Sequence, residues 1–166
     1  MLDYLYDRIA EVSEVDEVHV VTNARFAEDF RAWARTVERA VPVAVHDDGT
    51  TSNDDRLGAV GDMSFAIERG GFEGEDLLVV AGDNLIGYRL DELVSFWRAK
   101  GGVAATAVHR VSDRELIKQY GVVELDENDR VVSLQEKPSE PRSDLAATAA
   151  YLYPASLAAP PAARSA

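Results

Sequence analysis

Apolar and polar positions follow a helical period and a strand period in turn through the first two thirds of the chain. Apolar residues at helical spacing predict helices over residues 2–12, 26–37, 57–69 and 90–97. Short apolar runs between them predict strands at residues 17–22, 42–46, 77–80 and 103–109. Strands that alternate with helices are joined by right-handed crossovers. The pattern therefore favours an α/β fold whose sheet is largely parallel.

The last third of the chain departs from this alternation. After a short predicted helix at 113–119, two strand-like runs, 121–125 and 131–135, flank a polar turn and predict a late β-hairpin. A last strand is predicted over 146–153, and the Ala- and Pro-rich segment from Pro154 is expected to be a frayed or disordered tail. We expect one α/β domain over residues 1–153, with a mixed sheet, and a tail over 154–166.

The stretch from Leu77 to Asn84 combines a buried-type strand with a turn and an acid. Four apolar residues lead into Ala81 and Gly82, and Asp83 then follows. Open α/β sheets bind ligands at the carboxyl ends of their strands, where Asp83 is expected. A carboxylate at that place is a natural ligand for Mg²⁺, which uses few carboxylates together with substrate phosphates. The alternative is that Asp83 caps a turn or the next helix.

Composition excludes several classes of protein. The 166 residues carry 30 acids and 17 bases, a net charge of −13, which disfavours binding to nucleic acid. The chain has no cysteine and no apolar run long enough to span a membrane, so a cytoplasmic location is the default expectation. Motifs of serine hydrolases, P-loop enzymes and dinucleotide-binding proteins are absent. The three histidines share no metal-ligand spacing and are expected to be structural.

Three short segments remain as candidates for chemistry: Ala-Gly-Asp-Asn at 81–84, Tyr-Gly-Val-Val-Glu at 120–124 and Gln-Glu-Lys-Pro at 135–138. Lys137 lies at the end of an apolar strand, where a lysine can hold a phosphate as a point charge. Glu136 can accept hydrogen bonds from sugar hydroxyls. Gly121 permits a ligand to approach the backbone closely. Taken singly, Glu136 and Lys137 also fit a solvated surface pair.

In this order the three segments resemble the sugar-phosphate nucleotidyltransferases, in particular the glucose-1-phosphate thymidylyltransferase and uridylyltransferase group. The resemblance covers about residues 1–153. Its most specific part is Tyr-Gly-Val-Val-Glu-Leu-Asp-Glu-Asn-Asp-Arg-Val-Val-Ser-Leu-Gln-Glu-Lys-Pro, residues 120–138. It implies a Rossmann-like three-layer fold, with a mostly parallel but mixed sheet and the late hairpin.

The resemblance also implies roles for individual residues. Asp83 matches the family's metal-binding aspartate, and Lys137 matches the residue that binds the sugar phosphate. Glu136 matches the group that binds sugar hydroxyls, and Gly121 matches a backbone contact to the sugar. The remaining implied contacts are those of Leu57, Gly58 and Gly82 with the nucleotide, and that of Ala147 with the sugar. The segment Ala147–Ala149, Ala-Thr-Ala, stands where the family often has Val-Thr-Gly.

The implied reaction transfers a nucleotidyl group from UTP or dTTP to a sugar-1-phosphate, with Mg²⁺ as cofactor and release of pyrophosphate. Positioning and charge neutralisation carry most of the catalysis of such a reaction. The family's glycine-rich triphosphate loop and its second metal aspartate have no counterpart in the sequence, so we expect the middle of the fold, truncated at both ends. The alternative is a non-catalytic fragment that binds sugar phosphate or nucleotide, or that forms a homo-oligomer.

Overall fold

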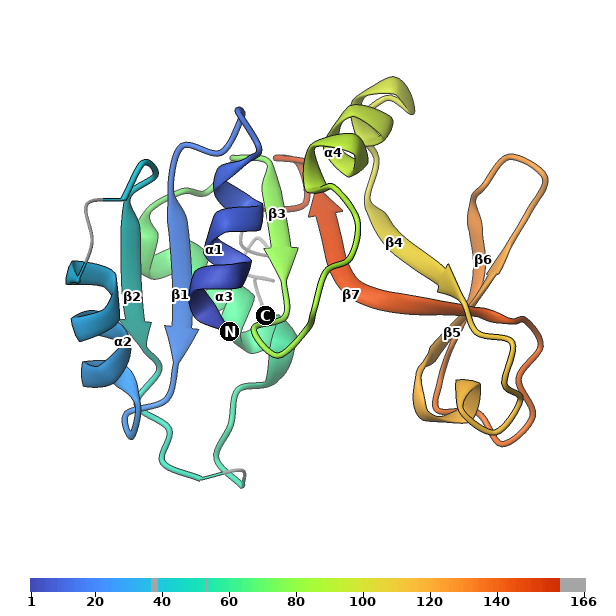
Figure 1. Cartoon of the computed structure of the whole chain (residues 1–166), viewed down its shortest axis with the longest axis horizontal. Coiled ribbons are helices and arrows are strands. Elements are labelled where there is room, and N and C mark those ends of the chain that lie inside the picture. The colour runs from blue at the N-terminus through green and yellow to red at the C-terminus, as the bar shows by residue number, and fades with distance from the viewer. Residues whose placement is uncertain (37–38, 53, 159–166) are drawn as a thin grey trace, which may run out of the picture.

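The computed structural model describes residues 1–36, 39–52 and 54–158, and it begins with the predicted alternation of helices and strands (Figure 1). The elements of this part are α1 (Leu2–Ala10), β1 (Val18–Thr22), α2 (Ala27–Arg35), β2 (Val43–Asp47), α3 (Gly58–Gly70), β3 (Leu77–Val80) and α4 (Leu90–Ala99). Each predicted element is confirmed within a few residues. Val37, the last residue of the predicted second helix, lies outside the described residues.

The last third forms the predicted hairpin and final strand. Its elements are β4 (Ala105–Arg110), the 3₁₀ helix η1 (Ile117–Gln119), β5 (Gly121–Leu125), β6 (Val131–Glu136) and β7 (Leu145–Tyr153). The predicted helix at 113–119 is thus a single 3₁₀ turn. The first residues of the predicted tail form a turn in which the Leu157 N–H donates to Pro154 O (2.8 Å), and Ala158 is 3% exposed. Residues 159–166 lie outside the described part.

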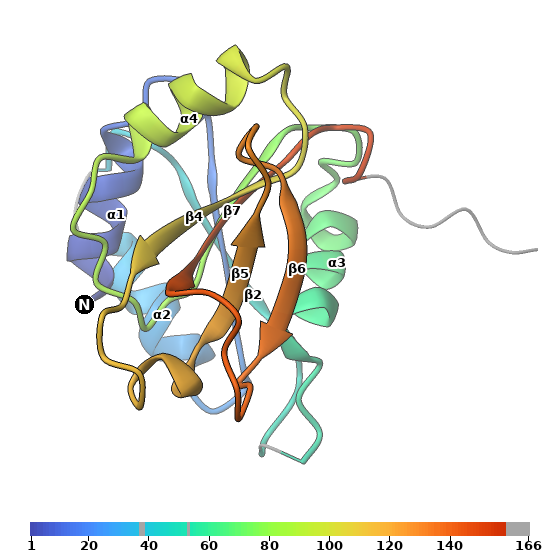
Figure 2. The same ribbon diagram turned by 90° about the vertical axis from the view of Figure 1, so that its right-hand side faces the viewer.

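The strands form two sheets, and Figure 2 looks onto the larger one. β1 and β2 pair in parallel. The larger sheet has the order β3-β7-β5-β6, with β4 also paired to β7. The α/β class is confirmed, but the predicted single, mostly parallel sheet is not observed: among the described residues, parallel and antiparallel pairing occur in separate sheets. Because β7 runs antiparallel to β3, β4 and β5, and β5 runs antiparallel to β6, every described pair of the larger sheet is antiparallel.

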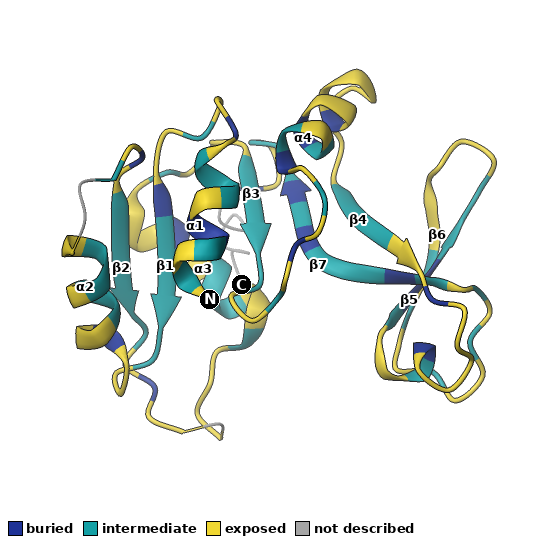
Figure 3. Cartoon of the chain, viewed as in Figure 1, coloured by how far each residue is buried: buried dark blue, intermediate teal, exposed yellow. Residues whose placement is uncertain are grey.

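Helix α1 connects the two sheets through its apolar face. Tyr6 packs in a cluster with Val18 of β1, and Leu5 packs in a second cluster with Leu90 of α4. Figure 3 shows most of the deeply buried positions along these contacts and on β5 and β7. Because side chains alternate along a strand, β1 turns Val18 toward α1 and His19 toward Phe72, which follows α3. The β1–β2 pair is therefore covered on both faces.

Strand β7 belongs to both ends of the larger sheet, and it bends between them (Figure 1). Its last residues pair with β3, and its first residues pair with β5. At the bend Ala149 has a φ of 50°, in the left-handed region that L-residues rarely adopt. The register of the neighbouring β4 shifts between Thr106 and Val108 at the same level. These irregularities bend the sheet without ending its pairing.

None of the helices among the described residues combines the length and the apolar composition that a membrane span requires.

Candidate functional site

The loop after β3 presents Asp83 at the strand's carboxyl end. The Ala81 N–H donates to Ala149 O (3.0 Å), which holds the end of the strand against β7. The Asn84 N–H donates back to Ala81 O (3.3 Å), so Gly82 and Asp83 project on a tight turn, and both are exposed. Among the described residues no hydrogen bond or ion pair engages the Asp83 carboxylate. It is therefore open to a ligand in solution.

The hairpin and β7 bring together three of the residues predicted to contact a sugar. Gly121 of β5 lies opposite Glu136 of β6 in the ladder. A Cβ placed on Gly121 would lie 3.4 Å from Glu136 Oε2 and 4.0 Å from Ala147 Cβ. The carboxylate thus lies directly over the glycine, beside β7. A larger residue at position 121 would fill the space in front of this carboxylate.

Lys137 completes this group, because the backbone turns sharply at its position. Its φ is 45°, a strained value for a residue other than glycine, and its N–H donates to Tyr120 O (3.1 Å). Lys137 Nζ lies 3.8 Å from Glu136 Oε1, and both side chains are mostly exposed. An exposed pair at this distance contributes little to stability. The ammonium group therefore remains available to an anion.

Leu57 and Gly58 lie apart from this group, where α3 begins. Gly58 has a φ of 73°, and Leu57 is 44% exposed. In Figure 1, β1, β2 and β3 point the same way, and their carboxyl ends lie toward the end of the molecule where α3 begins. No hydrogen bond or ion pair among the described residues links Leu57 or Gly58 to Asp83. Leu57 and Gly58 therefore lie toward the carboxyl ends of these strands, and their predicted contact with the nucleotide stays a prediction.

A set of polar links next to Asp83 was not predicted from the sequence. The Asn84 side-chain amide donates to Thr148 O (2.8 Å), and Tyr88 Oη is 2.9 Å from Thr148 Oγ1. Both Asn84 and Thr148 fall inside segments that the sequence had singled out. Their pairing could not be read from it, because they are 64 residues apart and the register of β7 sets the contact.

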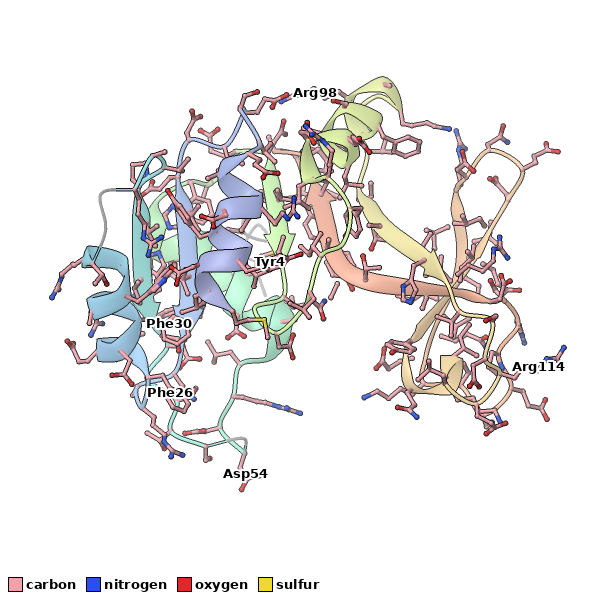
Figure 4. The ribbon with its side chains drawn as sticks, viewed as in Figure 1. Tyr4, Phe26, Phe30, Asp54, Arg98 and Arg114 are labelled. Carbon is pink, nitrogen blue, oxygen red and sulfur yellow. The ribbon has the colours of Figure 1, made fainter. Side chains whose placement is uncertain are left out.

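The 81–89 loop is also held from α1. The hydroxyl of Tyr4, which is labelled in Figure 4, donates to the carbonyl of Ile86. Ile86 is 2% exposed and belongs to the larger core cluster. The segment that carries Asp83 is therefore anchored on both sides, by α1 and by β7.

The acidic loop before α3 satisfies its own carboxylates. Asp55 accepts hydrogen bonds from the N–H groups of Thr51 (3.0 Å) and Ser52 (2.8 Å), and these bonds lower the pKa of its carboxyl to about 2. No cluster of three or more His, Cys, Asp or Glu side chains that could hold a metal ion is found in the described ranges. Asp83 offers a single carboxylate, which fits Mg²⁺ only when phosphate oxygens complete the coordination.

Two of the three histidines meet across the parallel strands. His19 Nδ1 lies 2.8 Å from His46 Nε2, and His19 Nε2 lies 3.2 Å from Glu17 Oε2. Burial, the neighbouring His19 and Arg69 lower the pKa of His46. This pair is 27 residues apart in sequence, so only the register of β1 on β2 brings it together.

Two surface hollows lie away from the candidate residues. One of about 350 Å³ is lined by Trp97, Arg98 and neighbouring residues, and one of about 250 Å³ is lined by His46, Arg69 and neighbours. Neither includes Asp83, Gly121, Glu136 or Lys137. Gly82, Asp83, Glu136 and Lys137 are instead exposed at the surface.

Comparison with known proteins gives a consistent result. The family model described as nucleotidyl transferase matches residues 1–163. A UTP–glucose-1-phosphate uridylyltransferase of Synechocystis is 30% identical over 125 residues, which cover 72% of this chain and 32% of that protein. A glucose-1-phosphate thymidylyltransferase of Streptomyces antibioticus is 39% identical over 80 residues, or 48% of this chain and 22% of that protein. The chain therefore spans about a third or less of these relatives.

Solved structures share the fold at low sequence identity. The structure of a Bacillus anthracis protein described as a glucose-1-phosphate thymidylyltransferase superposes with a TM-score of 0.69 and 17% identity, covering 93% of this chain and 58% of that one. An apo UDP-glucose pyrophosphorylase superposes with a TM-score of 0.68 and 16% identity, covering 94% and 65%. The predicted α/β architecture is thus shared over nearly the whole chain.

Proposed function

Because the chain belongs to the nucleotidyl transferase family, we propose that it binds a sugar-1-phosphate and a nucleoside triphosphate, UTP or dTTP, and transfers the nucleotidyl group between them. The observation that carries this proposal is the group formed by Gly121, Glu136 and Lys137 on the hairpin. The ladder places a carboxylate over a glycine, and the next residue carries an ammonium group on a strained backbone.

Each member of this group has a distinct part in binding the sugar-1-phosphate. Gly121 leaves room for a sugar ring against the strand, because it has no side chain. The Glu136 carboxylate accepts hydrogen bonds from sugar hydroxyls. Lys137 neutralises the sugar phosphate, which matters because the chain carries a net charge of −13 and repels anions as a whole.

Asp83 is assigned to the nucleotide half of the site. A divalent cation, Mg²⁺ in our proposal, would be held by this carboxylate and by triphosphate oxygens, and it would reduce the repulsion between two anionic substrates. Gly82, which precedes Asp83 on the same exposed turn, is assigned to the nucleotide. Leu57 and Gly58, where α3 begins, are assigned to the nucleotide, in keeping with the end of the sheet at which they lie.

The proposed reaction is a displacement at phosphorus. An oxygen of the sugar-1-phosphate forms a bond to the α-phosphorus, the bond between the α-phosphorus and the bridging oxygen to the β-phosphate breaks, and pyrophosphate leaves. The chain's own residues orient the attacking phosphate and screen its charge. The reaction requires no nucleophilic side chain, and the chain has no cysteine.

Release of pyrophosphate, measured with the purified chain, Mg²⁺, glucose-1-phosphate and either UTP or dTTP, tests the reaction. Calorimetric titration with glucose-1-phosphate tests the binding group separately. Lys137→Ala should weaken this binding at least about tenfold, since it removes a charge-assisted contact. Lys118→Ala is the matched control, because Lys118 instead pairs with Glu115 at 2.6 Å. Equal affinity for both variants would contradict the assignment of Lys137.

A second candidate function is binding of sugar phosphate without turnover. It is favoured by the single, exposed carboxylate of Asp83 and by the absence of a metal-ligand cluster from the described residues. In this case glucose-1-phosphate at 100 times its Kd should stabilise the folded chain by about 2.7 kcal/mol through mass action, and so raise the melting temperature, while no pyrophosphate is released. Pyrophosphate release above the level of an Asp83→Asn variant would exclude it.

A further inference from the structure

The two halves of the proposed site are joined through the bend of β7. The residues assigned to the sugar lie on the hairpin, which pairs with the first part of β7. Asp83 follows β3, which pairs with the last part of β7. Residues 147–149 lie between these two pairings. Whatever fixes the backbone at this point therefore fixes the angle between the two halves.

Thr148 is hydrogen-bonded to three residues of two other segments at the bend. Its Oγ1 donates to Ala107 O (3.0 Å), at the place where the register of β4 shifts. Since a hydroxyl has one proton, the 2.9 Å contact with Tyr88 must run from Tyr88 Oη to Thr148 Oγ1. The Thr148 carbonyl accepts from Asn84 Nδ2 (2.8 Å). The segments 84–88, β4 and β7 thus meet at one residue.

The neighbours of these atoms are residues of the proposed site. Asn84 directly follows Asp83. Ala147 directly precedes Thr148, and its Cβ lies 4.0 Å from the Cβ position of Gly121. Tyr88 also packs against the larger core cluster, so its hydroxyl is a firmly placed donor. Ala149, with a φ of 50°, does not hold the bend by its own preference. The bend is held by contacts with its neighbours, which include the hydrogen bonds of Thr148 and the bond from the Ala81 N–H to Ala149 O.

We propose that Thr148 is a positioning residue that fixes the Asp83 loop relative to the group of Gly121, Glu136 and Lys137. This inference rests on the proposed function for its catalytic consequence, but not for its structural one. Misplacement of reacting groups by about 1 Å can lower a rate about 100-fold, even when each group is intact. Loss of the Thr148 hydroxyl should therefore lower the turnover rate and leave the affinity for the sugar phosphate nearly unchanged.

A spin-label distance measurement tests the structural part without any ligand. The chain has no cysteine, so Leu85→Cys and Val132→Cys introduce the only two labelling sites, at positions that are 74% and 65% exposed. Thr148→Val, which keeps the shape but lacks the hydroxyl, should broaden or shift the distance distribution. Thr148→Ser should restore it. Tyr88→Phe should act in the same direction, and it serves as the second variant if Thr148→Val does not fold.

The catalytic consequence of this positioning role is tested by measuring turnover and binding on the same variants. Thr148→Val should lower kcat about 100-fold while the Kd for glucose-1-phosphate changes less than about twofold, and Thr148→Ser should recover most of kcat. An unchanged distance distribution in both Thr148→Val and Tyr88→Phe overturns the positioning role. No turnover and no binding in the unmodified chain, together with a broadened distribution in Thr148→Val, overturns the proposed function and leaves the positioning role standing.

Discussion

The two sheets differ in how far they bury their strands. In the parallel pair, Val18 is the only buried residue of β1, and every residue of β2 is partly exposed. In the antiparallel sheet, Val122, Val123, Ala146 and Ala150 are completely buried. Strand β5 has five residues, as β1 and β2 do. An apolar sequence therefore does not by itself determine the burial of a strand, which also depends on its neighbours.

The difference follows from the edges of the strands. The Val18 N–H donates to Pro42 O (2.9 Å) of the segment leading into β2, so the backbone groups of His19 and Val21 point to the other edge of β1. Within the described residues, β1 pairs only with β2, and β3 pairs only with β7. Strand β7, in contrast, has neighbours on both sides. Side chains on a strand with one neighbour are covered less completely.

Val122→Ala, set against a matched change in β1, should show the largest difference in stability between the two regions. Val122 is 0% exposed, so loss of its two methyl groups leaves a cavity and should lower the free energy of unfolding by about 2 kcal/mol. Val20→Ala in β1 is the matched control and should cost about half as much, because Val20 is only partly buried. Urea unfolding followed by circular dichroism measures both. Equal losses would show that β1 is as well packed as β5.

Tyr6→Phe examines how the smaller sheet is held despite its open edge. Tyr6 Oη donates to Val41 O (3.1 Å) and accepts from the Val41 N–H (2.9 Å), and both residues are buried. Phenylalanine keeps the packing but leaves both backbone groups of Val41 without a hydrogen-bond partner. The free energy of unfolding should therefore fall by about 1.5 kcal/mol.

Tyr151→Phe in β7 is the control, since no hydrogen bond of its hydroxyl is found among the described residues. It should change the urea midpoint by much less. A larger loss for Tyr151→Phe than for Tyr6→Phe would contradict this account of how the smaller sheet is stabilised.

Much of this architecture was predictable, because local signals determine it. Helical spacing of apolar residues located α1 to α4, and the turn at 126–130 located the hairpin with its Gly121 and Glu136. What could not be predicted depends on register between distant segments. The pairing of β7 with β3 decides both the antiparallel sheet and the contact of Asn84 with Thr148.

The same distinction applies to the candidate residues. Gly121, Glu136 and Lys137 lie within 17 positions of one another on a single hairpin, so their grouping follows from local structure. Leu57 and Gly58 have no such link to Asp83, and their assignment depends on the arrangement of whole elements. The left-handed backbone of Lys137 and Ala149 carried no signal, because neither residue type favours that conformation.

Ala149→Gly should stabilise the chain, in contrast to nearly all changes in a buried sheet. At a φ of 50°, the Cβ of alanine is sterically strained, and glycine has no Cβ. The substitution should therefore raise the free energy of unfolding by about 1 kcal/mol. Ala147→Gly, two residues earlier and without a positive φ, should instead destabilise by about 0.5 to 1 kcal/mol, owing to the greater freedom of glycine in the unfolded chain. Melting temperatures compare the two. Destabilisation by both would show that the bend at Ala149 is not strained.

His46 should make the parallel pair, but not the antiparallel sheet, sensitive to mild acid. Burial, His19 and Arg69 lower its pKa, against a weaker opposing effect of Glu17. Below the ordinary histidine pKa of about 6.5, the unfolded chain therefore binds more protons than the folded chain. The free energy of unfolding is then highest above that pH and falls as the pH is lowered through it. The fall ends where the folded His46 protonates as well. The effect should be the smallest of the four, because water still reaches the ring and screens its charge.

His46→Gln should flatten the dependence of the urea midpoint on pH between about 5.5 and 7.5, whereas His109→Gln, on an exposed part of β4, should leave it unchanged. The same slope in His46→Gln as in the unmodified chain would assign the acid sensitivity to other groups and remove this difference between the two sheets.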